Sequence, residues 1–410
     1  MLDRLTIGRM VAWSGDRPVL VALSGGGDSV ALLHLLVAEF GASRLRAVIV
    51  DHALRAGAAD DAKHAQSIAH SLAVPADILT LTWEEGANRA QQAAREARYR
   101  AICDQARALG LNTIATAHTA DDQAETVLMR AANGSTWRGL AGAAPFSFAP
   151  LWPEGRGIAL ARPLLSARRE RLRDHLRLVG AAWLEDPANR NPKFERVRVR
   201  QRLAELEQRG LDPMRVASVA ARLRRRGDTL DSAASALIAR ATQLSLSIEI
   251  ARAAWTGPNE VRQRALSALI AAASGASREP PWKQMAALEE RAMHARQSFT
   301  HSGIEFIPNG AGIVLRREPG AVLGRADGAP ALEPLWLTAE VEAIWDGRLG
   351  VTASEAGWRV VPARNGELVA FENGPARKRY RDVGDHLRLR SLAAARVMHA
   401  FAPDINRAKP

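Results

Sequence analysis

The chain has 410 residues, of which 47% are hydrophobic and 24% are charged, as is typical of folded domains and not of a disordered chain. This length exceeds one compact core of usual size, so we expect two or three domains. The formal net charge of +12 favours a polyanionic partner, although an arginine-rich proteome would produce the same excess.

Apolar runs and cysteine content exclude further classes of protein. Every apolar run is broken well short of the roughly 20 residues that a bilayer requires, and the first residues lack the apolar core of a secretion signal. We therefore expect a cytoplasmic protein without membrane contact. The single cysteine, Cys103, excludes an intramolecular disulfide and any zinc or iron–sulfur site ligated by several cysteines of one chain. Its helix-like surroundings predict an inert buried thiol.

The first part of the chain alternates short apolar runs with longer stretches of helical pattern. Strands are predicted at residues 18–23, 46–50, 76–81 and 112–117, and helices at about 29–40, 58–73 and 87–109. Nearly continuous apolar strands separated by helices indicate a parallel sheet that is covered on both faces. We therefore predict an α/β fold with a Rossmann-like parallel sheet.

The remainder of the chain has a different composition. Residues 163–210 are dense in arginine, residues 211–295 have the pattern of successive helices, and residues 299–317 predict paired short strands around the Asn309-Gly310 turn. A stretch rich in Pro, Gly and Ala at 318–334 predicts a linker. We therefore expect the α/β domain at 1–205, a helical domain at 206–320 and a small C-terminal α+β region at 321–410.

A glycine-rich loop joins the first predicted strand to the first predicted helix. Its three glycines allow the backbone to approach a phosphate closely, and the start of a helix adds free N–H donors and a favourable dipole. The serine hydroxyls can donate further hydrogen bonds, and the aspartate is placed to meet Mg²⁺ rather than phosphate. The loop consists of Ser24, Gly25, Gly26, Gly27, Asp28 and Ser29.

Two commoner phosphate loops do not fit this sequence. A Walker A loop ends in Gly-Lys-Ser/Thr, and this loop has no lysine. A dinucleotide-binding fingerprint requires a small residue where Val30 stands. The alternative, a glycine-rich turn without a ligand, is disfavoured by the acidic residue and the flanking strand and helix. The segment LVALSGGGDS instead resembles the PP-loop of the ATP pyrophosphatases, which implies cleavage of ATP between its α and β phosphates through an adenylated intermediate.

Other predicted elements also carry polar groups. Asp51 and His52 directly follow the second strand, at the sheet edge where ligands of open α/β folds bind. Arg95 and Arg98 belong to an AR-x-x-RY pattern on the third predicted helix, where a solvated arginine face explains them as well as function does.

The segment AHTADDQAET at 117–126 follows the fourth strand. On a helix, Asp121 and Glu125 share one face, and so do His118 and Asp122. A solvated acidic helix start would explain the two aspartates, but it would not explain the histidine and Gln123 in the same turn. We therefore favour a functional role for this segment.

Several segments together resemble the tRNA(Ile)-lysidine synthases. These are HTADDQAET, the LMR at 128–130, the GLAG at 139–142, the RPLL at 162–165 and the EDPAN at 185–189. The resemblance covers about residues 18–202. It departs from the family at Val197, where an asparagine is frequent, and at residues 133–136, where an RGSG-type turn is usual.

The resemblance implies a modification in two steps. The O2 of the wobble cytidine in the CAU anticodon of an isoleucine tRNA attacks the α-phosphorus of ATP, and pyrophosphate leaves. The amine of free lysine then attacks C2 and expels AMP.

The resemblance also implies cofactors and site residues. Implied cofactors are ATP and Mg²⁺, with Asp28 as the metal ligand. Implied catalytic residues are Asp28, His118, Asp121 and Asp122; ATP is implied to contact the loop, Asp51 and His52; and implied substrate-binding residues are Arg95, Arg98, Glu125, Arg196 and Arg200.

A basic belt and the C-terminal region are predicted to contact tRNA. The belt contains Arg168, Arg169, Arg171, Arg173, Arg177, Arg196, Arg198, Arg200 and Arg202.

Alternative functions for the chain are a PP-loop tRNA thiolase, which usually needs several cysteines, a PP-loop synthetase that makes GMP or NAD, and a non-catalytic tRNA-binding protein with a decayed nucleotide site. The oligomeric state is left open, with a homodimer as one possibility.

Overall fold

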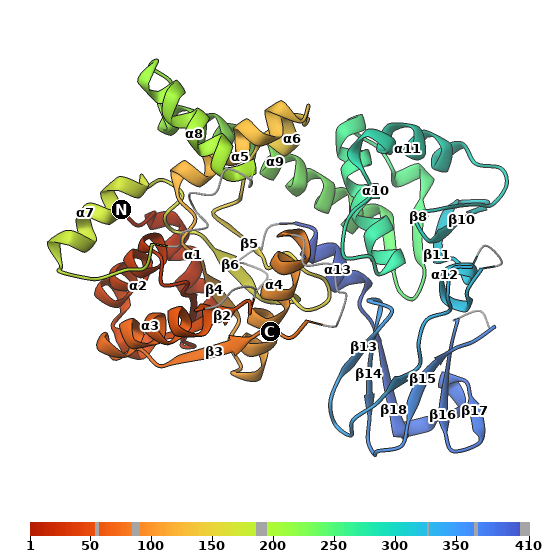
Figure 1. Ribbon diagram of the computed structural model, residues 1–410. Helices are drawn as coiled ribbons and strands as arrows, with labels where there is room; N and C mark the ends of the chain where they lie inside the picture. The colour runs from red at the N-terminus through yellow and green to blue at the C-terminus, as the bar shows by residue number, and fades with distance from the viewer. Residues whose placement is uncertain (54–56, 84–90, 186–194, 326–327, 365–367, 402–410) are drawn as a thin grey trace. The chain divides into compact units, whose positions relative to one another are not determined.

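The computed structural model describes residues 1–53, 57–83, 91–185, 195–325, 328–364 and 368–401 (Figure 1). These residues form two compact units, one of residues 1–228 and the other of residues 229–401. The three-domain division at residues 205 and 320 stays a prediction. No helix among the described residues is long and apolar enough to cross a membrane.

Unit 1 is built on a six-stranded sheet in the order β3-β2-β1-β4-β6-β5. All neighbouring strands are parallel except β5, which runs antiparallel to β6. The strands are β1 (Val19–Ala22), β2 (Leu45–Asp51), β3 (Ala76–Thr80), β4 (Thr113–Ala115), β5 (Phe146–Phe148) and β6 (Ala159–Ala161). The helices are α1 (Arg4–Ser14), α2 (Gly27–Phe40), α3 (Ala58–Ser71), α4 (Gln91–Ala108), α5 (Ala120–Ala132), α6 (Trp137–Leu140), α7 (Arg169–Leu178), α8 (Glu195–Gln208) and α9 (Pro213–Ala241), the last of which continues into unit 2.

Both faces of this sheet are buried. On β1, Val19 and Val21 pack into a core with apolar residues of α1, α2, α3 and α7, whereas Leu20 packs into a second core with residues of α4. Successive side chains of a strand point to opposite faces, so a strand apolar at every position needs helices on both sides. Figure 1 shows α3 and α4 on opposite sides of the strands. The predicted α/β sheet is therefore confirmed.

Cys103 belongs to the core beneath α4 and is fully buried. Burial raises the pKa of its thiol to about 12, so the reactive thiolate is absent at neutral pH. The prediction of an inert core thiol is confirmed.

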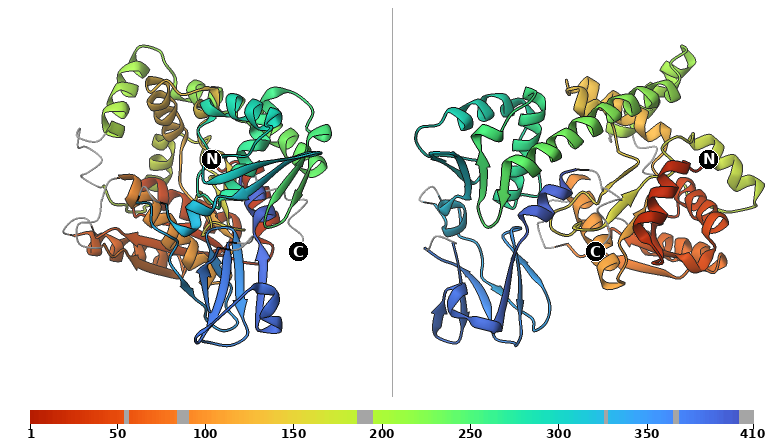
Figure 2. Two further views of the ribbon diagram at one scale, coloured as in Figure 1. Left: turned by 90° about the vertical axis from the view of Figure 1, so that its right-hand side faces the viewer. Right: turned by 180° about the vertical axis from the view of Figure 1, so that it is seen from behind.

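Unit 2 contains three antiparallel sheets and four further helices among the described residues. The sheets have the orders β7-β8-β11-β10-β9, β12-β15-β16-β17 and β13-β14-β18 (Figure 2). The last two share one apolar core. The strands are β7 (Thr242–Leu244), β8 (Ile248–Ala251), β9 (Phe299–His301), β10 (Ile304–Asn309), β11 (Gly312–Arg317), β12 (Leu335–Trp336), β13 (Ala343–Trp345), β14 (Leu349–Ala353), β15 (Arg359–Pro362), β16 (Val369–Asn373), β17 (Ala376–Lys378) and β18 (Leu387–Ser391). The helices are α10 (Asn259–Ser274), α11 (Met285–His294), α12 (Pro319–Leu323) and α13 (Ala393–His399).

The hairpin predicted around Asn309 is present as β10 and β11. Asn309 Oδ1 accepts a hydrogen bond of 2.6 Å from the N–H of Gly312, which closes the turn. The predicted linker is partly structured, because it contains α12, while residues 326–327 lie outside the described part of the chain.

Candidate active site

The glycine-rich loop is held in shape by its own serines. Ser29 Oγ accepts a hydrogen bond of 3.1 Å from the N–H of Ser24 and donates one of 2.9 Å to the carbonyl of Gly26. Gly25 has a φ of +78°, and a Cβ at this position would lie 2.8 Å from Leu184. Both the backbone and the packing therefore require glycine here. The loop ends at the N-terminus of α2, where unpaired N–H groups can bind phosphate.

Helix α5 begins in a capping box that fixes Asp122. The N–H of Thr119 donates to Asp122 Oδ2 at 2.8 Å, and the N–H of Asp122 donates to Thr119 Oγ1 at 3.3 Å. One oxygen of Asp122 is thus used in the cap, and Oδ1 is directed to arginines of α7 and α8. Gln123 has a structural role, because its amide forms hydrogen bonds of 2.9 and 2.8 Å with the backbone of Ala143.

Asp28, Asp122 and Glu125 meet at one guanidinium, that of Arg169, and we call these three carboxylates the acidic cluster. Arg169 Nε donates to Asp28 Oδ2 at 2.9 Å, Nη2 to Asp122 Oδ1 at 2.8 Å, and Nη1 to Glu125 Oε1 at 3.3 Å. The guanidinium therefore joins the PP-loop to helix α5, which we call the acidic helix.

Helix α8 adds two more guanidinium groups to the acidic cluster. The fully buried Glu125 accepts hydrogen bonds of 2.7 Å from Arg196 Nε and 2.8 Å from Arg200 Nε. Arg196 Nη2 also donates to Asp122 Oδ1 at 2.8 Å. Such charge-assisted pairs are among the stronger hydrogen bonds in proteins. They fix the carboxylates of Asp122 and Glu125 in place.

The two aspartates of the acidic cluster differ in acidity. Burial raises the pKa of Asp28 above its usual value, and Arg169 offsets this effect only in part. Burial also acts to raise the pKa of Asp122, but the charges of Arg169 and Arg196 outweigh it and lower the pKa. Asp122 is therefore the more firmly ionised of the two.

A second group of arginines, the cationic cluster of Arg95, Arg98 and Arg162, surrounds Tyr99. The guanidinium groups of Arg95 and Arg98 lie 4.9 and 5.4 Å from the centre of its ring. Burial lowers the pKa of both Arg98 and Arg162, and the charge of Arg95 adds to this effect. Within the described residues, Arg162 Nε is buried without a hydrogen-bond partner. Unbalanced cations of this kind favour a bound anion.

Comparisons with known proteins agree with this geometry. Residues 4–207 match the PP-loop domain family. A tRNA(Ile)-lysidine synthase of Ruegeria pomeroyi is 37% identical over 80% of this chain and 75% of its own length, and one of Mesorhizobium japonicum is 37% identical over 86% and 76%. The chain belongs to the tRNA(Ile)-lysidine synthase family. A third relative, from Hyphomonas neptunium, is 48% identical over 46% of this chain, and that match spans about half, 51%, of the relative's length.

Membership of the tRNA(Ile)-lysidine synthase family confirms three predictions made from the sequence. These are the family resemblance itself, the PP-loop α/β fold and the class of ATP-dependent ligase. The roles of individual residues stay predictions, and the structure reports where each residue lies.

Asp51 and His52 lie at the end of β2, beside the strand that carries the PP-loop. Asp51 Oδ1 accepts a hydrogen bond of 2.8 Å from the N–H of Ala53, which has a φ of +51°. Burial and then the charge of Arg98 lower the pKa of His52, so its imidazole is neutral. Its Nδ1 is buried without a hydrogen-bond partner among the described residues, and it is free to meet a ligand.

Asp121 points away from the acidic cluster. Its carboxylate accepts hydrogen bonds of 3.1 Å from Arg168 Nε and 2.7 Å from the N–H of Arg169, so it anchors the start of α7. Arg168 also pairs with Glu207 at 3.0 Å. Arg168 and Arg169, which the sequence placed in a belt for tRNA phosphates, therefore face carboxylates of their own chain.

His118 is a neutral imidazole in the folded protein. Its Nδ1 lies 3.0 Å from Thr116 Oγ1, and burial together with the charge of Arg162 lowers its pKa to about 3. The unfolded chain takes up this proton near pH 6.5, whereas the folded chain does so only near pH 3. The stability present above pH 6.5 is therefore lost as the pH falls toward 3.

We expect His118→Gln to reduce the loss of stability on acidification. Between pH 7 and pH 5 the histidine accounts for about 2 kcal/mol of that loss. Thermal melts at several pH values measure it, with the exposed His64→Gln as a matched control. Equal pH slopes for the wild type and both variants would contradict the assignment.

Proposed function

We propose that this chain joins lysine to C2 of the wobble cytidine in the CAU anticodon of an isoleucine tRNA. The observation that supports the proposal is the meeting of the PP-loop and helix α5 at Arg169, because it joins a loop suited to ATP phosphates to a helix that carries carboxylates. The family to which the chain belongs supports this choice of substrate.

In the first step, cytidine O2 attacks the α-phosphorus of ATP and the bond to the β-phosphate breaks. The leaving pyrophosphate develops negative charge, which preorganised N–H donors and cations stabilise. The N-terminus of α2 supplies the N–H donors, and the cationic cluster of Arg95, Arg98 and Arg162 supplies the cations. The product is a cytidine adenylated at O2.

In the second step, the lysine amine attacks C2, the bond from C2 to O2 breaks, and AMP leaves with that oxygen. Lysine binds as an ammonium ion, which Asp28 attracts, because Asp122 already pairs with two guanidinium groups and Glu125 with three. The amine must then lose a proton before it can attack. Asp122 and His118 accept a proton poorly because their pKa values are lowered, whereas the raised pKa of Asp28 makes this carboxylate the better acceptor.

Mg²⁺ is part of the proposal only as a partner of ATP. No group of three His, Cys, Asp or Glu side chains within the described ranges is arranged to hold a metal ion, and Asp28 already pairs with Arg169. Mg²⁺ commonly binds through one or two carboxylates together with substrate phosphates and waters. Asp28 fits that mode, and the ion would neutralise charge on the leaving pyrophosphate.

We also place the enzyme in the cytoplasm, where its tRNA substrate would be found. A homodimer and a tRNA contact by residues 321–410 stay predictions.

We expect pyrophosphate release to require both ATP and the isoleucine tRNA with the CAU anticodon, and AMP release to require lysine as well. The measurement is a time course of both products with purified protein, with each substrate omitted in turn. AMP release driven by a sulfur donor instead of lysine would favour a tRNA thiolase. Tight tRNA binding without either product would favour a non-catalytic tRNA-binding protein.

A further inference from the structure

A pocket of about 370 Å³ lies on the exposed face of the β7-β8-β11-β10-β9 sheet in unit 2. In the register of β10 and β11, Ile307 opposes Val314 and Glu305 opposes Arg316, so these four side chains share one face. They give the pocket an apolar part and a charged part. Leu246, in the turn between β7 and β8, extends the apolar part.

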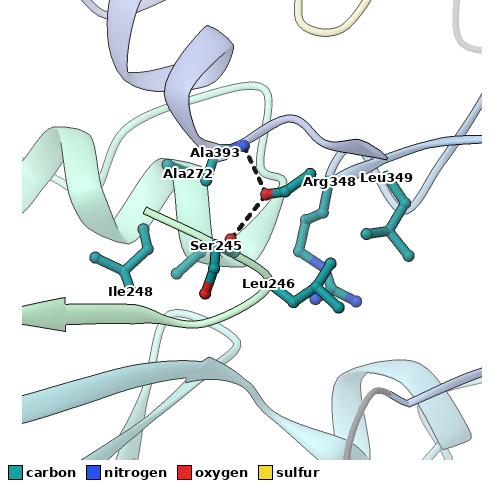
Figure 3. A pocket seen from close by; sticks show the side chains of 9 residues that line it. Ser245, Leu246, Ile248, Ala272, Arg348, Leu349 and Ala393 are labelled. Atoms are coloured by element: carbon teal, nitrogen blue, oxygen red, sulfur yellow. Dashed lines mark hydrogen bonds between the residues drawn. The ribbon is translucent and has the colours of Figure 1, made fainter. Parts of the chain in front are cut away.

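Arg348 contributes an unsatisfied donor to this pocket. Its side chain is only 7% exposed, and Nε donates to Asp346 Oδ2 at 2.6 Å. Its Nη2 is buried and has no hydrogen-bond partner among the residues that the structure describes. Figure 3, a close view of a smaller neighbouring pocket, shows the guanidinium of Arg348 beside Leu246, and both residues also line the pocket of about 370 Å³.

The charges around Arg348 do not balance. Arg317 forms two hydrogen bonds, of 3.0 and 2.9 Å, with the same Asp346, so two guanidinium groups share one carboxylate. Arg316 pairs with Glu305 at 2.7 Å, yet its Nε is buried and has no partner within the described part of the chain. A buried donor without a partner costs free energy, and a bound anion would remove that cost. The excess positive charge and the free donors therefore favour an anion.

The size and the walls of the pocket limit the ligand. The volume is in the range of small-molecule sites, and a lone inorganic phosphate would leave the apolar wall of Leu246, Ile307 and Val314 in contact with water. Guanidinium groups match the geometry of phosphate oxygens. We infer that this pocket binds a phosphate monoester with an apolar or aromatic body, with the phosphate on Arg348 and Arg316 and the body against Ile307 and Val314.

This inference goes beyond the proposed function, whose catalytic and ATP-binding residues all belong to unit 1. A nucleotide with a terminal phosphate has the required chemistry, and it can come from two sources: free AMP or the 5′-terminal nucleotide of a bound RNA. The experiment therefore needs one arm for each source. It also needs variants that leave the PP-loop unchanged.

The variants are Arg348→Lys, Arg316→Gln and, as a control, Arg390→Gln. Lysine at 348 keeps a cation for Asp346 but removes the free Nη2, and Arg316 is 40% exposed, so its replacement does not open the core. Arg390 belongs to the same unit, is 57% exposed and pairs with Glu342. Melting temperatures check that every variant is folded.

In the first arm, equilibrium dialysis of the full chain with labelled AMP should reveal two sites per chain, one of which Arg348→Lys and Arg316→Gln weaken about tenfold or more. Adenosine, which lacks the phosphate, should not compete at that site. In the second arm, the same variants should weaken tRNA binding by a similar factor while Arg390→Gln does not. A loss in the first arm assigns free AMP, and a loss in the second arm assigns RNA. If neither arm distinguishes the two variants from Arg390→Gln, the inference is overturned, whether or not the lysidine reaction is observed.

Discussion

We expect Asp28→Asn to lower the rate of ATP-dependent pyrophosphate release by about 100-fold to 1000-fold, the usual effect of removing one group that stabilises transition-state charge. Asparagine can still accept the hydrogen bond from Arg169, so the PP-loop keeps its position. The variant loses the negative charge that Mg²⁺ and the lysine amine would both use. Because burial opposes ionisation of Asp28, the neutral side chain should not lower the melting temperature.

The matched control for this variant is Asp60→Asn. Asp60 also lies in the first turn of a helix that follows a strand of the same sheet, but its side chain is 84% exposed and pairs only weakly with Lys63. A titration with Mg²⁺ separates two roles of Asp28. A defect in pyrophosphate release that shrinks at high Mg²⁺ identifies metal binding, and a defect in lysine-dependent AMP release that stays constant identifies proton transfer. Equal rates for Asp28→Asn and Asp60→Asn would contradict both roles.

The architecture of unit 1 was largely predictable because its signals are local. β1 is apolar at every position, and the glycines of the PP-loop follow it directly, so strand, loop and helix could all be placed from the sequence. The same holds for the start of α5, where Thr119 and Asp122 have the spacing of a capping box. The sheets of β12–β18 were not predicted in detail, because their strands are short and their pairing depends on contacts far apart in the sequence.

The candidate site was predictable only in part. The sequence placed Asp28, Asp122 and Glu125 in the site, but it assigned Arg169 to a belt for tRNA. Arg169 reaches the carboxylates because α7 packs against α2, and no local pattern reports that contact. A signal was present, however: Arg169 lies close after the RPLL segment and next to Arg168, whose partner is Asp121. Both arginines closely follow the RPLL segment, which the family resemblance groups with the HTADDQAET segment of α5.

Glu125→Gln should destabilise unit 1 by about 3 kcal/mol, because loss of one partner of a buried ion pair leaves charge without compensation. Glu125 is 0% exposed and lies within 3.3 Å of three guanidinium groups, those of Arg169, Arg196 and Arg200. Arg196 and Arg200 can turn partly to water, and Arg169 keeps its two aspartates, so we expect the lower end of the usual range.

For a unit of this size, that loss of stability corresponds to a melting temperature lower by about 6–12 °C. Differential scanning calorimetry of the full chain resolves the transition, with Glu205→Gln as the matched control. Glu205 lies on α8 in an exposed pair with Arg202, which contributes no more than about 1 kcal/mol. The melting temperature of Asp122→Asn should fall between those of the two glutamate variants. Asp122 pairs with two guanidinium groups instead of three, and asparagine can still accept the hydrogen bond of the helix cap. If Glu125→Gln and Glu205→Gln melt at the same temperature, Glu125 is not needed to hold the three arginines in place. The contact between the PP-loop and helix α5 must then rest on Asp28 and Asp122 alone.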